Sequence, residues 1–183
     1  GFLVFSYEDG DLAHFISGNN EWTIYSRENS DYSPDDISSF LSDDQGGLWI
    51  GMYKGGLAHF SNNGKWTLYT IDNSDLPGNS VLALLNDKQG GLWIGTNGGL
   101  AHFSGDGNWR VYTEVNSDLP KCGFSSLLSD VQGGLWASCD GLAHFGSDGK
   151  WTIYTEDNSE LPGNNVSSLL RDGQGALWIG TDQ

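Results

Sequence analysis

Basic residues are scarce in this chain of 183 residues, which has 8 lysines and arginines against 24 aspartates and glutamates and a formal net charge of -16. Such a surface repels the phosphates of nucleic acids and the headgroups of anionic membranes, so we expect no nucleic acid among its partners. Long apolar runs are also missing. The longest, such as VLALL at residues 81–85, are far too short to cross a bilayer, and no membrane insertion is expected.

A helical pattern is absent as well. No segment keeps apolar residues three and four positions apart, and no stretch of ten residues is free of turn-forming residues. What the chain does contain is 27 glycines and 13% aromatic residues. That composition is typical of short aromatic-rich strands joined by tight turns. The sequence therefore predicts an all-β fold.

Four copies of one unit make up the chain. The sequence LAHF occurs at residues 12–15, 57–60, 100–103 and 142–145, at spacings of 45, 43 and 42 residues. Repeats of about 43 residues with four strand-like segments are typical of a β-propeller blade built from a four-stranded antiparallel sheet. We therefore predict a single β-propeller domain over residues 1–183. Its repeats run over approximately 1–44, 45–88, 89–131 and 132–173, followed by a partial strand at 174–183.

The four strands of a unit are named here by their sequence: strand A is VSSLL-like, strand B is LWIGT-like, strand C is GLAHF and strand D is WTIY-like. A D-x-x-G turn joins A to B, with Asp starting the turn and Gly taking the positive φ. Two segments, residues 3–7 and 177–181, compete as strand B where the ends of the chain would meet. Three arrangements stay open: a closed four-blade ring with one spare strand, half of a ring completed by a second copy, or a piece of a larger propeller.

The pattern D-x-x-G-G-L-W-I-G-T-x-x-G-L-x-x-F, as in residues 87–103, resembles the two-component regulator propeller repeat. The resemblance covers essentially the whole chain, in four copies and a fragment. It implies a periplasmic or secreted β-propeller that senses or binds a ligand, often a carbohydrate. Domains of that family usually have more blades than four, which favours a fragment or an oligomer here.

Residues that recur in every unit are interpreted as parts of the fold. Histidines of strand C in separate blades cannot converge on one metal ion, and no nucleophile stands at a fixed spacing from them. Tryptophans of strands B and D are expected to pack blade against blade. No metal and no cofactor are expected. The residues are His14, His59, His102 and His144, with Trp49, Trp93, Trp136 and Trp178 on strand B and Trp22, Trp66, Trp109 and Trp151 on strand D.

Two binding interpretations of repeated residues stand beside this one. The outer tryptophans of strand D could stack sugar rings, one per blade. The N-S-[DE] sequence of the loop between strands D and A is expected to organise turns. Its carboxylates Asp75, Asp118 and Glu160 offer a weaker possibility of a calcium site.

Residues that break the repeat in loops are the better candidates for function. The B–C and D–A loops of a propeller emerge on one face, and there the copies differ, as suits a binding surface. The ligand-binding candidates are Tyr7, Glu8, Tyr32, Asp36, Tyr53, Lys54, Thr96, Asn97, Lys121 and Asp140.

The two cysteines occupy one unit. Cys122 comes just before strand A and Cys139 ends strand B, and the tight A–B turn brings the start of A beside the end of B. We therefore predict a Cys122–Cys139 disulfide, which suits an oxidising compartment. The alternative is two free thiols.

The function predicted is a non-catalytic propeller that binds a carbohydrate or other small ligand on its B–C/D–A loop face. The second hypothesis is a self-assembling or protein-interaction scaffold that completes a larger ring, with a homodimer as the simplest form. A propeller lyase is the third, and it would need a non-repeated His or Glu near the axis, which the sequence does not show.

Overall fold

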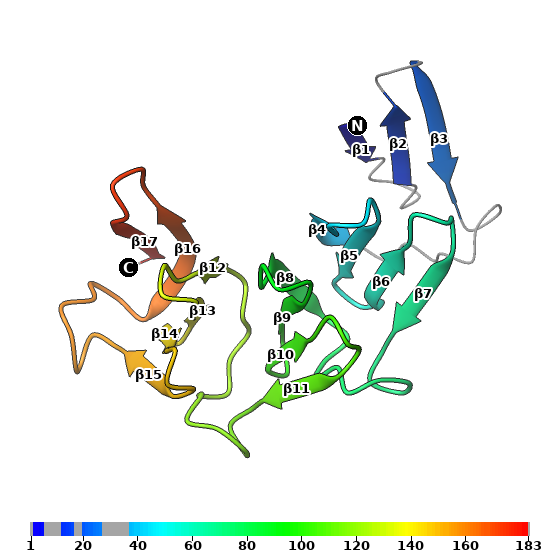
Figure 1. The fold of residues 1–183 in the computed structure, drawn as a ribbon. Helices are drawn as coiled ribbons and strands as arrows, with labels where there is room; N and C mark the ends of the chain where they lie inside the picture. Colours follow the sequence, from blue (N-terminus) through cyan, green and yellow to red (C-terminus); the bar gives the residue numbers. More distant parts are fainter. Residues whose placement is uncertain (1, 6–11, 17–19, 27–36, 183) are drawn as a thin grey trace.

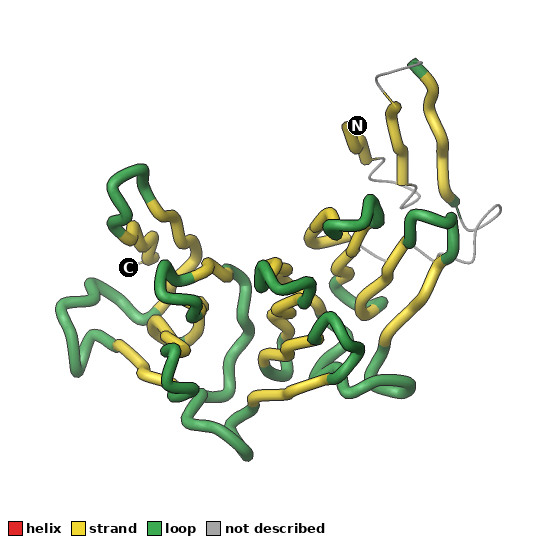
Figure 2. The backbone as a smooth tube through the Cα atoms, viewed as in Figure 1, coloured by secondary structure: helices red, strands yellow, loops and turns green. Residues whose placement is uncertain are grey.

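The computed structural model describes residues 2–5, 12–16, 20–26 and 37–182 of the chain, which form antiparallel strands and loops (Figure 2). Three four-stranded blades lie between a three-stranded sheet and a two-stranded one. The strands are β1 (Phe2–Phe5), β2 (Leu12–Ile16), β3 (Glu21–Tyr25), β4 (Ile37–Ser42), β5 (Leu48–Met52), β6 (Gly56–Phe60), β7 (Trp66–Tyr69), β8 (Val81–Asn86), β9 (Leu92–Thr96), β10 (Leu100–Phe103), β11 (Trp109–Tyr112), β12 (Leu127–Ser129), β13 (Leu135–Cys139), β14 (Gly141–Phe145), β15 (Trp151–Tyr154), β16 (Asn165–Arg171) and β17 (Leu177–Asp182).

The sheets follow one another along an open arc (Figure 1). The A strands β4, β8, β12 and β16 line its concave side, and the D strands β7, β11 and β15 lie on its convex side. We call the sheets the first (β1–β3), second (β4–β7), third (β8–β11), fourth (β12–β15) and fifth (β16–β17) blades. Of the three arrangements that the sequence leaves open, the chain does not adopt the closed four-blade ring: within the described residues β17 pairs with β16 and β1 pairs with β2.

The A–B turns have the predicted chemistry. In the third blade the Asp87 carboxylate oxygen Oδ1 accepts the backbone N–H groups of Gln89 and Gly91, each at 2.7 Å, and Gly90 has a φ of 88°. The other carboxylate oxygen accepts a hydrogen bond from His102 Nε2 on strand C at 2.7 Å. One aspartate therefore closes the turn and ties strand C to it.

The histidines of strand C are parts of the fold. His59, His102 and His144 donate to the turn aspartates of their own blades, over 2.8, 2.7 and 3.1 Å. Each imidazole also packs against the strand-B tryptophan of the same blade, with ring centroids 4.0, 4.4 and 3.9 Å apart. An imidazole held in this way by two partners is a structural element of the blade rather than a free base.

Aromatic rings fill the spaces between blades. Trp66, Trp109 and Trp151 of strand D each contact the strand-D tyrosine of the preceding blade, with centroids 5.5 to 5.7 Å apart. Trp151 is buried and the other two are half-buried. These three rings pack blade against blade, as the sequence predicts. Burial removes Trp151 from the alternative set of sugar platforms, and for Trp66 and Trp109 that interpretation stays a hypothesis.

The fourth blade departs from its siblings at strand A. Its strand-A segment is FSSLL at residues 124–128, but β12 begins only at Leu127. The reason is Ser138, which stands where the neighbouring blade has Gly95: its hydroxyl accepts the backbone N–H groups of Ser125 and Ser126, at 3.2 and 2.8 Å. A side-chain oxygen thus replaces the ladder bonds that would extend the strand.

Candidate functional site

The B–C turns and D–A loops meet on one side of the blades, which we call the loop face. The N–H of Gly56 donates to the carbonyl of Asn79 at 2.9 Å, and the N–H of Gly141 donates to that of Asn164 at 2.6 Å. Each bond joins a B–C turn to the D–A loop that follows the same blade. The loop face is therefore fixed by backbone hydrogen bonds.

The repeated N-S-[DE] sequence organises the D–A loops, as predicted. In the loop of residues 113–123, Asn116 Oδ1 accepts the N–H of Thr113 at 2.8 Å, its Nδ2 donates to the carbonyl of Val111 at 3.0 Å, and Ser117 Oγ donates to the carbonyl of Thr113 at 2.7 Å. The loops that begin at Thr70 and Thr155 repeat this set. The Asn and Ser side chains therefore make their hydrogen bonds to the backbone around their own loop.

The carboxylates of this sequence, Asp75, Asp118 and Glu160, are exposed. Among the described residues, no group of three or more His, Cys, Asp or Glu side chains is placed to hold a metal ion.

Two predicted residues come together at the junction of the second and third blades. Ser80 Oγ donates to the backbone carbonyl of Tyr53, and the N–H of Asn97 donates to the carbonyl of Ser80 at 3.0 Å. Tyr53 and Asn97, which come from different blades, therefore flank one loop residue, and both are exposed, as is Lys54. The cluster of Tyr53, Lys54 and Asn97 therefore carries an aromatic ring, a cation and an amide on loop segments that meet at Ser80.

Thr96 is a correction to the predicted set. Its side chain is fully buried, and its hydroxyl donates to the carbonyl of Gly99 at 2.8 Å while accepting the N–H of Gly98 at 3.1 Å. The hydroxyl closes the B–C turn from inside, so it does not face a ligand. Tyr7, Glu8, Tyr32 and Asp36 lie outside the described residues.

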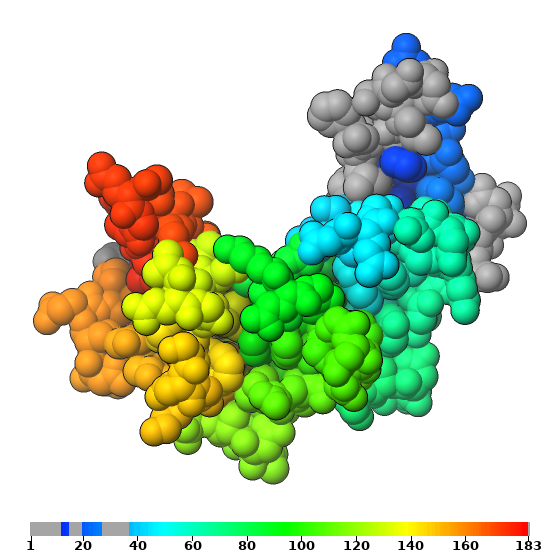
Figure 3. All heavy atoms as spheres, viewed as in Figure 1, coloured from blue at the N-terminus to red at the C-terminus, as the bar shows by residue number. Residues whose placement is uncertain are grey.

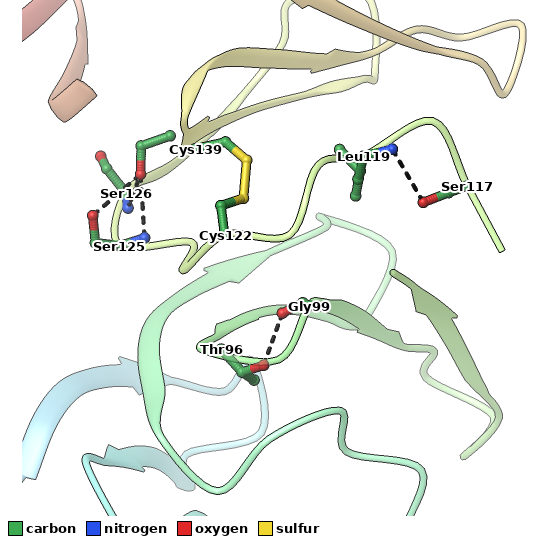
Figure 4. Close-up of a disulfide and its surroundings, with 9 residues drawn as sticks. Thr96, Gly99, Ser117, Leu119, Cys122, Ser125, Ser126 and Cys139 are labelled. Atoms are coloured by element: carbon green, nitrogen blue, oxygen red, sulfur yellow. Dashed lines mark hydrogen bonds between the residues drawn. A yellow bond between two sulfur atoms is a disulfide. The ribbon is translucent and has the colours of Figure 1, made fainter. Parts of the chain in front are cut away.

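A second group of candidates surrounds a disulfide. Cys122 and Cys139 are bonded, with their Cα atoms 5.5 Å apart, which is the pair that the sequence predicts (Figure 4). The bond joins the segment before β12 to the end of β13. Two exposed residues adjoin it in sequence, Lys121 on one side and Asp140 on the other.

Sequence reasoning missed the hollow beside this disulfide. A pocket of about 210 Å³ is lined by residues of the third blade's B–C turn and of the following D–A loop. Its lining residues are Gly98, Gly99, Thr113, Glu114, Val115, Pro120, Lys121 and Cys122. The signal available in the sequence was the replacement of Gly-Asn, found at 78–79 and 163–164, by Lys-Cys at 121–122.

A larger groove of about 450 Å³ lies where the fifth blade meets the fourth. Trp136, Leu142 and Tyr154 contribute from the fourth blade, and Leu177, Trp178 and Ile179 from β17. The remaining lining residues, 159–162, belong to the D–A loop that joins the two blades, so the groove at the end of the arc also reaches the loop face.

The family model of the two component regulator propeller matches residues 31–54, 75–98 and 160–183, and each match contains an A–B hairpin sequence with its D-x-x-G turn. The chain carries two-component regulator propeller repeats. No curated protein sequence matches the chain.

Solved structures share the fold of these regulator propeller repeats. The extracellular domain of a protein described as a one component system from B. thetaiotaomicron has a TM-score of 0.75 at 23% identity, over 94% of this chain and 24% of that one. A second such domain, from a protein of that organism described as a hybrid two component system, has a TM-score of 0.75 at 22% identity, over 98% of this chain and 23% of that one. The chain thus spans about a quarter of the length of these structures.

Enzymes of the propeller class are also similar to the regulator propeller repeats. Virginiamycin B lyase from Staphylococcus aureus, in a catalytically inactive form, has a TM-score of 0.71 at 14% identity, over 97% of this chain and 61% of that one. At such identities the likeness concerns the fold alone. Among the described residues, no helix is long and apolar enough to cross a membrane.

Proposed function

We propose that the chain is a non-catalytic sensing propeller that works outside the cytoplasm and binds a ligand, with a sugar favoured, on its loop face. The observation that carries the proposal is where the copies differ. Strand residues repeat from blade to blade, whereas Tyr53, Lys54 and Asn97 change identity and are exposed together around Ser80. A constant frame that carries variable exposed loops is the usual design of a binding surface.

The chemistry of this cluster supports a sugar. Tyr53 has 49% of its surface exposed, and its aromatic ring can offer an apolar face to the C–H side of a pyranose. The Asn97 amide and the Lys54 ammonium supply donors and an acceptor for hydroxyl groups.

Three further observations support a non-catalytic sensing role outside the cytoplasm. The histidines that could serve as a base are held by aspartate and tryptophan in each described full blade. The Cys122–Cys139 disulfide suits an oxidising compartment. The similar B. thetaiotaomicron structures are described as extracellular domains.

Binding to a panel of neutral mono- and oligosaccharides, followed by calorimetry, tests this function. We expect a saccharide whose affinity falls about tenfold or more in Tyr53→Ala and severalfold in Lys54→Ala, because stacking and a charged donor are each lost. Lys65→Ala, which removes an exposed lysine from a C–D turn, is the matched control and keeps full affinity. The proposal fails if no saccharide binds, or if binding survives both loop-face substitutions.

The second candidate function is a scaffold that completes a larger ring with another copy. The observation that favours it is the pair of incomplete blades at the ends of the arc (Figure 3). Within the described residues the fifth blade has strands A and B, and the first blade has strands B, C and D. The fifth blade lacks strands C and D, which the first blade has, and the first blade lacks strand A, which the fifth blade has.

A further inference from the structure

One D–A loop lacks a contact that its siblings make. In the loops of residues 70–80 and 155–165, an asparagine follows the Pro-Gly pair, and its side-chain oxygen accepts a backbone N–H from the start of the loop. Asn79 Oδ1 accepts from Ile71 at 3.0 Å, and Asn164 Oδ1 accepts from Glu156 at 2.9 Å. The equivalent residue in the loop of residues 113–123 is Cys122, whose side chain is bonded to Cys139 instead.

The same substitution coincides with the loss of a second bond. The carbonyl oxygens of Asn79 and Asn164 accept the N–H of the glycine before strand C, Gly56 or Gly141. The corresponding glycine at the third junction is Gly99. Neither its N–H nor that of Glu114 has a hydrogen-bond acceptor in the part of the chain that the structure describes. Backbone donors of this kind require water or a ligand to satisfy them.

Both unsatisfied donors belong to residues that line the pocket of about 210 Å³ beside the disulfide. Figure 4 shows Gly99 on the turn of the third blade, next to the segment that carries Cys122. Lys121 also lines the pocket, and its siblings are the glycines Gly78 and Gly163. Two amide donors and one ammonium group thus gather at the one D–A loop where Lys-Cys replaces Gly-Asn.

We infer that this pocket binds a carboxylate group. A carboxylate has two oxygens that accept hydrogen bonds from N–H groups and is attracted by an ammonium, whereas a neutral hydroxyl matches this donor set less well. The volume lies below the roughly 300–1,000 Å³ of sites that hold drug-sized ligands. The occupant is therefore a small organic acid or the acidic unit of a larger sugar. This site shares the B–C turn of residues 97–99 with the Tyr53 cluster, but neither Tyr53 nor Lys54 lines it.

The charges around the pocket do not prevent this binding. Lys121 Nζ lies 4.0 Å from Glu114 Oε1, and both side chains are exposed, Lys121 by 81%. Such an exposed ion pair is weak, so the ammonium can turn to a ligand. The net charge of -16 repels anions in general. At about 0.15 M salt, however, screening over about 8 Å limits that repulsion to the nearest carboxylates.

The first test is an amide NMR titration of the disulfide-bonded chain with acetate and its neutral analogue acetamide. We expect saturable shifts of the Glu114 and Gly99 amide signals with acetate, with an affinity on the order of millimolar for so small a ligand, and none with acetamide. Glucuronate and glucose form the second pair and distinguish an acidic sugar from a free acid by which carboxylate binds more tightly. Equal shifts with acetate and acetamide, or no shifts, would overturn the inference.

Variants of the loop provide the second test. Lys121→Gln should weaken acetate binding about fivefold, and Glu114→Gln should strengthen it about twofold, because one removes the attracting charge and the other a competing one. Lys150→Gln, which removes an exposed lysine from a C–D turn, serves as the control with unchanged affinity.

A third test uses a variant that restores the repeat sequence. It should remove the binding site while keeping a loop sequence that folds in the other blades. Lys121→Gly, Cys122→Asn and Cys139→Thr together reproduce the residues of the other loops and of strand B, so this variant is expected to fold. The new asparagine should cap Glu114 and abolish the acetate shifts. Persistent acetate binding in this variant would contradict the inference, while saccharide binding at Tyr53 tests the proposed function separately.

Discussion

At the scale of residues, the turn aspartates of the second and third blades, Asp43 and Asp87, each perform two tasks with their two carboxylate oxygens. One oxygen accepts backbone N–H groups of the A–B turn, and the other accepts the histidine of strand C. In the fifth blade, where the described residues include strands A and B only, Trp178 Nε1 donates to Asp172 Oδ2 at 2.9 Å instead. The second carboxylate oxygen therefore accepts from the histidine of strand C in a full blade and from the tryptophan of strand B in the fifth blade.

These aspartates predict how stability depends on pH. Partial burial by itself would raise the pKa of Asp87, but hydrogen bonds from Gln89, His102 and Gly91 outweigh it and lower the pKa below the ordinary 3.8. The folded state thus binds its proton less readily than the unfolded one. The resulting stability is present above pH 3.8 and is lost as the pH falls through the lowered pKa of the folded state.

We expect Asp87→Asn to reduce the free energy of unfolding at pH 7 by about 1–3 kcal/mol, because the charged acceptor of three hydrogen bonds is lost. The loss should shrink as the pH falls below 3.8 and through the lowered pKa of Asp87, because the wild-type carboxylate itself then becomes protonated. Urea denaturation at a series of pH values measures both effects. Asp148→Asn in an exposed C–D turn is the control, and equal losses for the two variants would refute this role for Asp87.

At the scale of elements, the disulfide takes the place of the Asn cap in its loop. It joins residues 17 apart in sequence, from the segment before β12 to the end of β13. β12 is a strand of three residues, shorter than β8 or β16, because Ser138 satisfies the donors that precede it. The covalent bond therefore holds the end of the hairpin that the strand ladder leaves open.

Reduction should destabilise the chain by about 3 kcal/mol, the loop-closure value for a loop of roughly this length. We expect thermal unfolding with dithiothreitol to begin at a lower temperature, and the Cys122→Ser, Cys139→Ser double variant to show the same decrease without reductant. A variant insensitive to reductant but as stable as the oxidised chain would contradict this role for the bond.

The strands and turns could be predicted from the sequence because the same strand and turn sequences recur in each unit. The disulfide could be predicted as well, since hairpin geometry alone brings Cys122 to Cys139. Thr96 could not be assigned correctly, because the partner of its hydroxyl is a backbone carbonyl within the turn. The pocket at Lys121 was hidden for a similar reason: it depends on two hydrogen bonds that a substitution fails to make.

At the scale of the whole molecule, the open arc was one of three arrangements that the sequence left undecided. Blade-to-blade contacts recur along the arc: a strand-D tyrosine packs on the next strand-D tryptophan at the first three junctions, and neighbouring A strands lie side by side from β4 to β16. Such contacts could form equally well with a blade of the same chain or with a blade of a second copy. Whether a closed ring forms therefore depends on what pairs with the first and fifth blades, and not on the contacts between the repeated blades.

The fifth blade leaves an apolar edge that self-association would cover. Trp178 and Leu170 each have 63% of their surface exposed, and the groove of about 450 Å³ lies beside β17. A strand edge with apolar side chains is a template for pairing with another chain. The C strand of a second copy's first blade has the sequence that pairs with strand B in every full blade that the structure describes.

If the scaffold hypothesis holds, native mass spectrometry at micromolar concentration will show assemblies of the 19.8 kDa chain, with the doubled mass as the simplest. Trp178→Ser should shift the population toward the monomer, because it removes the largest exposed apolar side chain of β17. Val131→Ser, at an exposed apolar residue of an A–B turn, should leave the distribution unchanged. A monomer at all concentrations, or equal effects of the two substitutions, would exclude assembly through this edge and leave the sensing function as the better account.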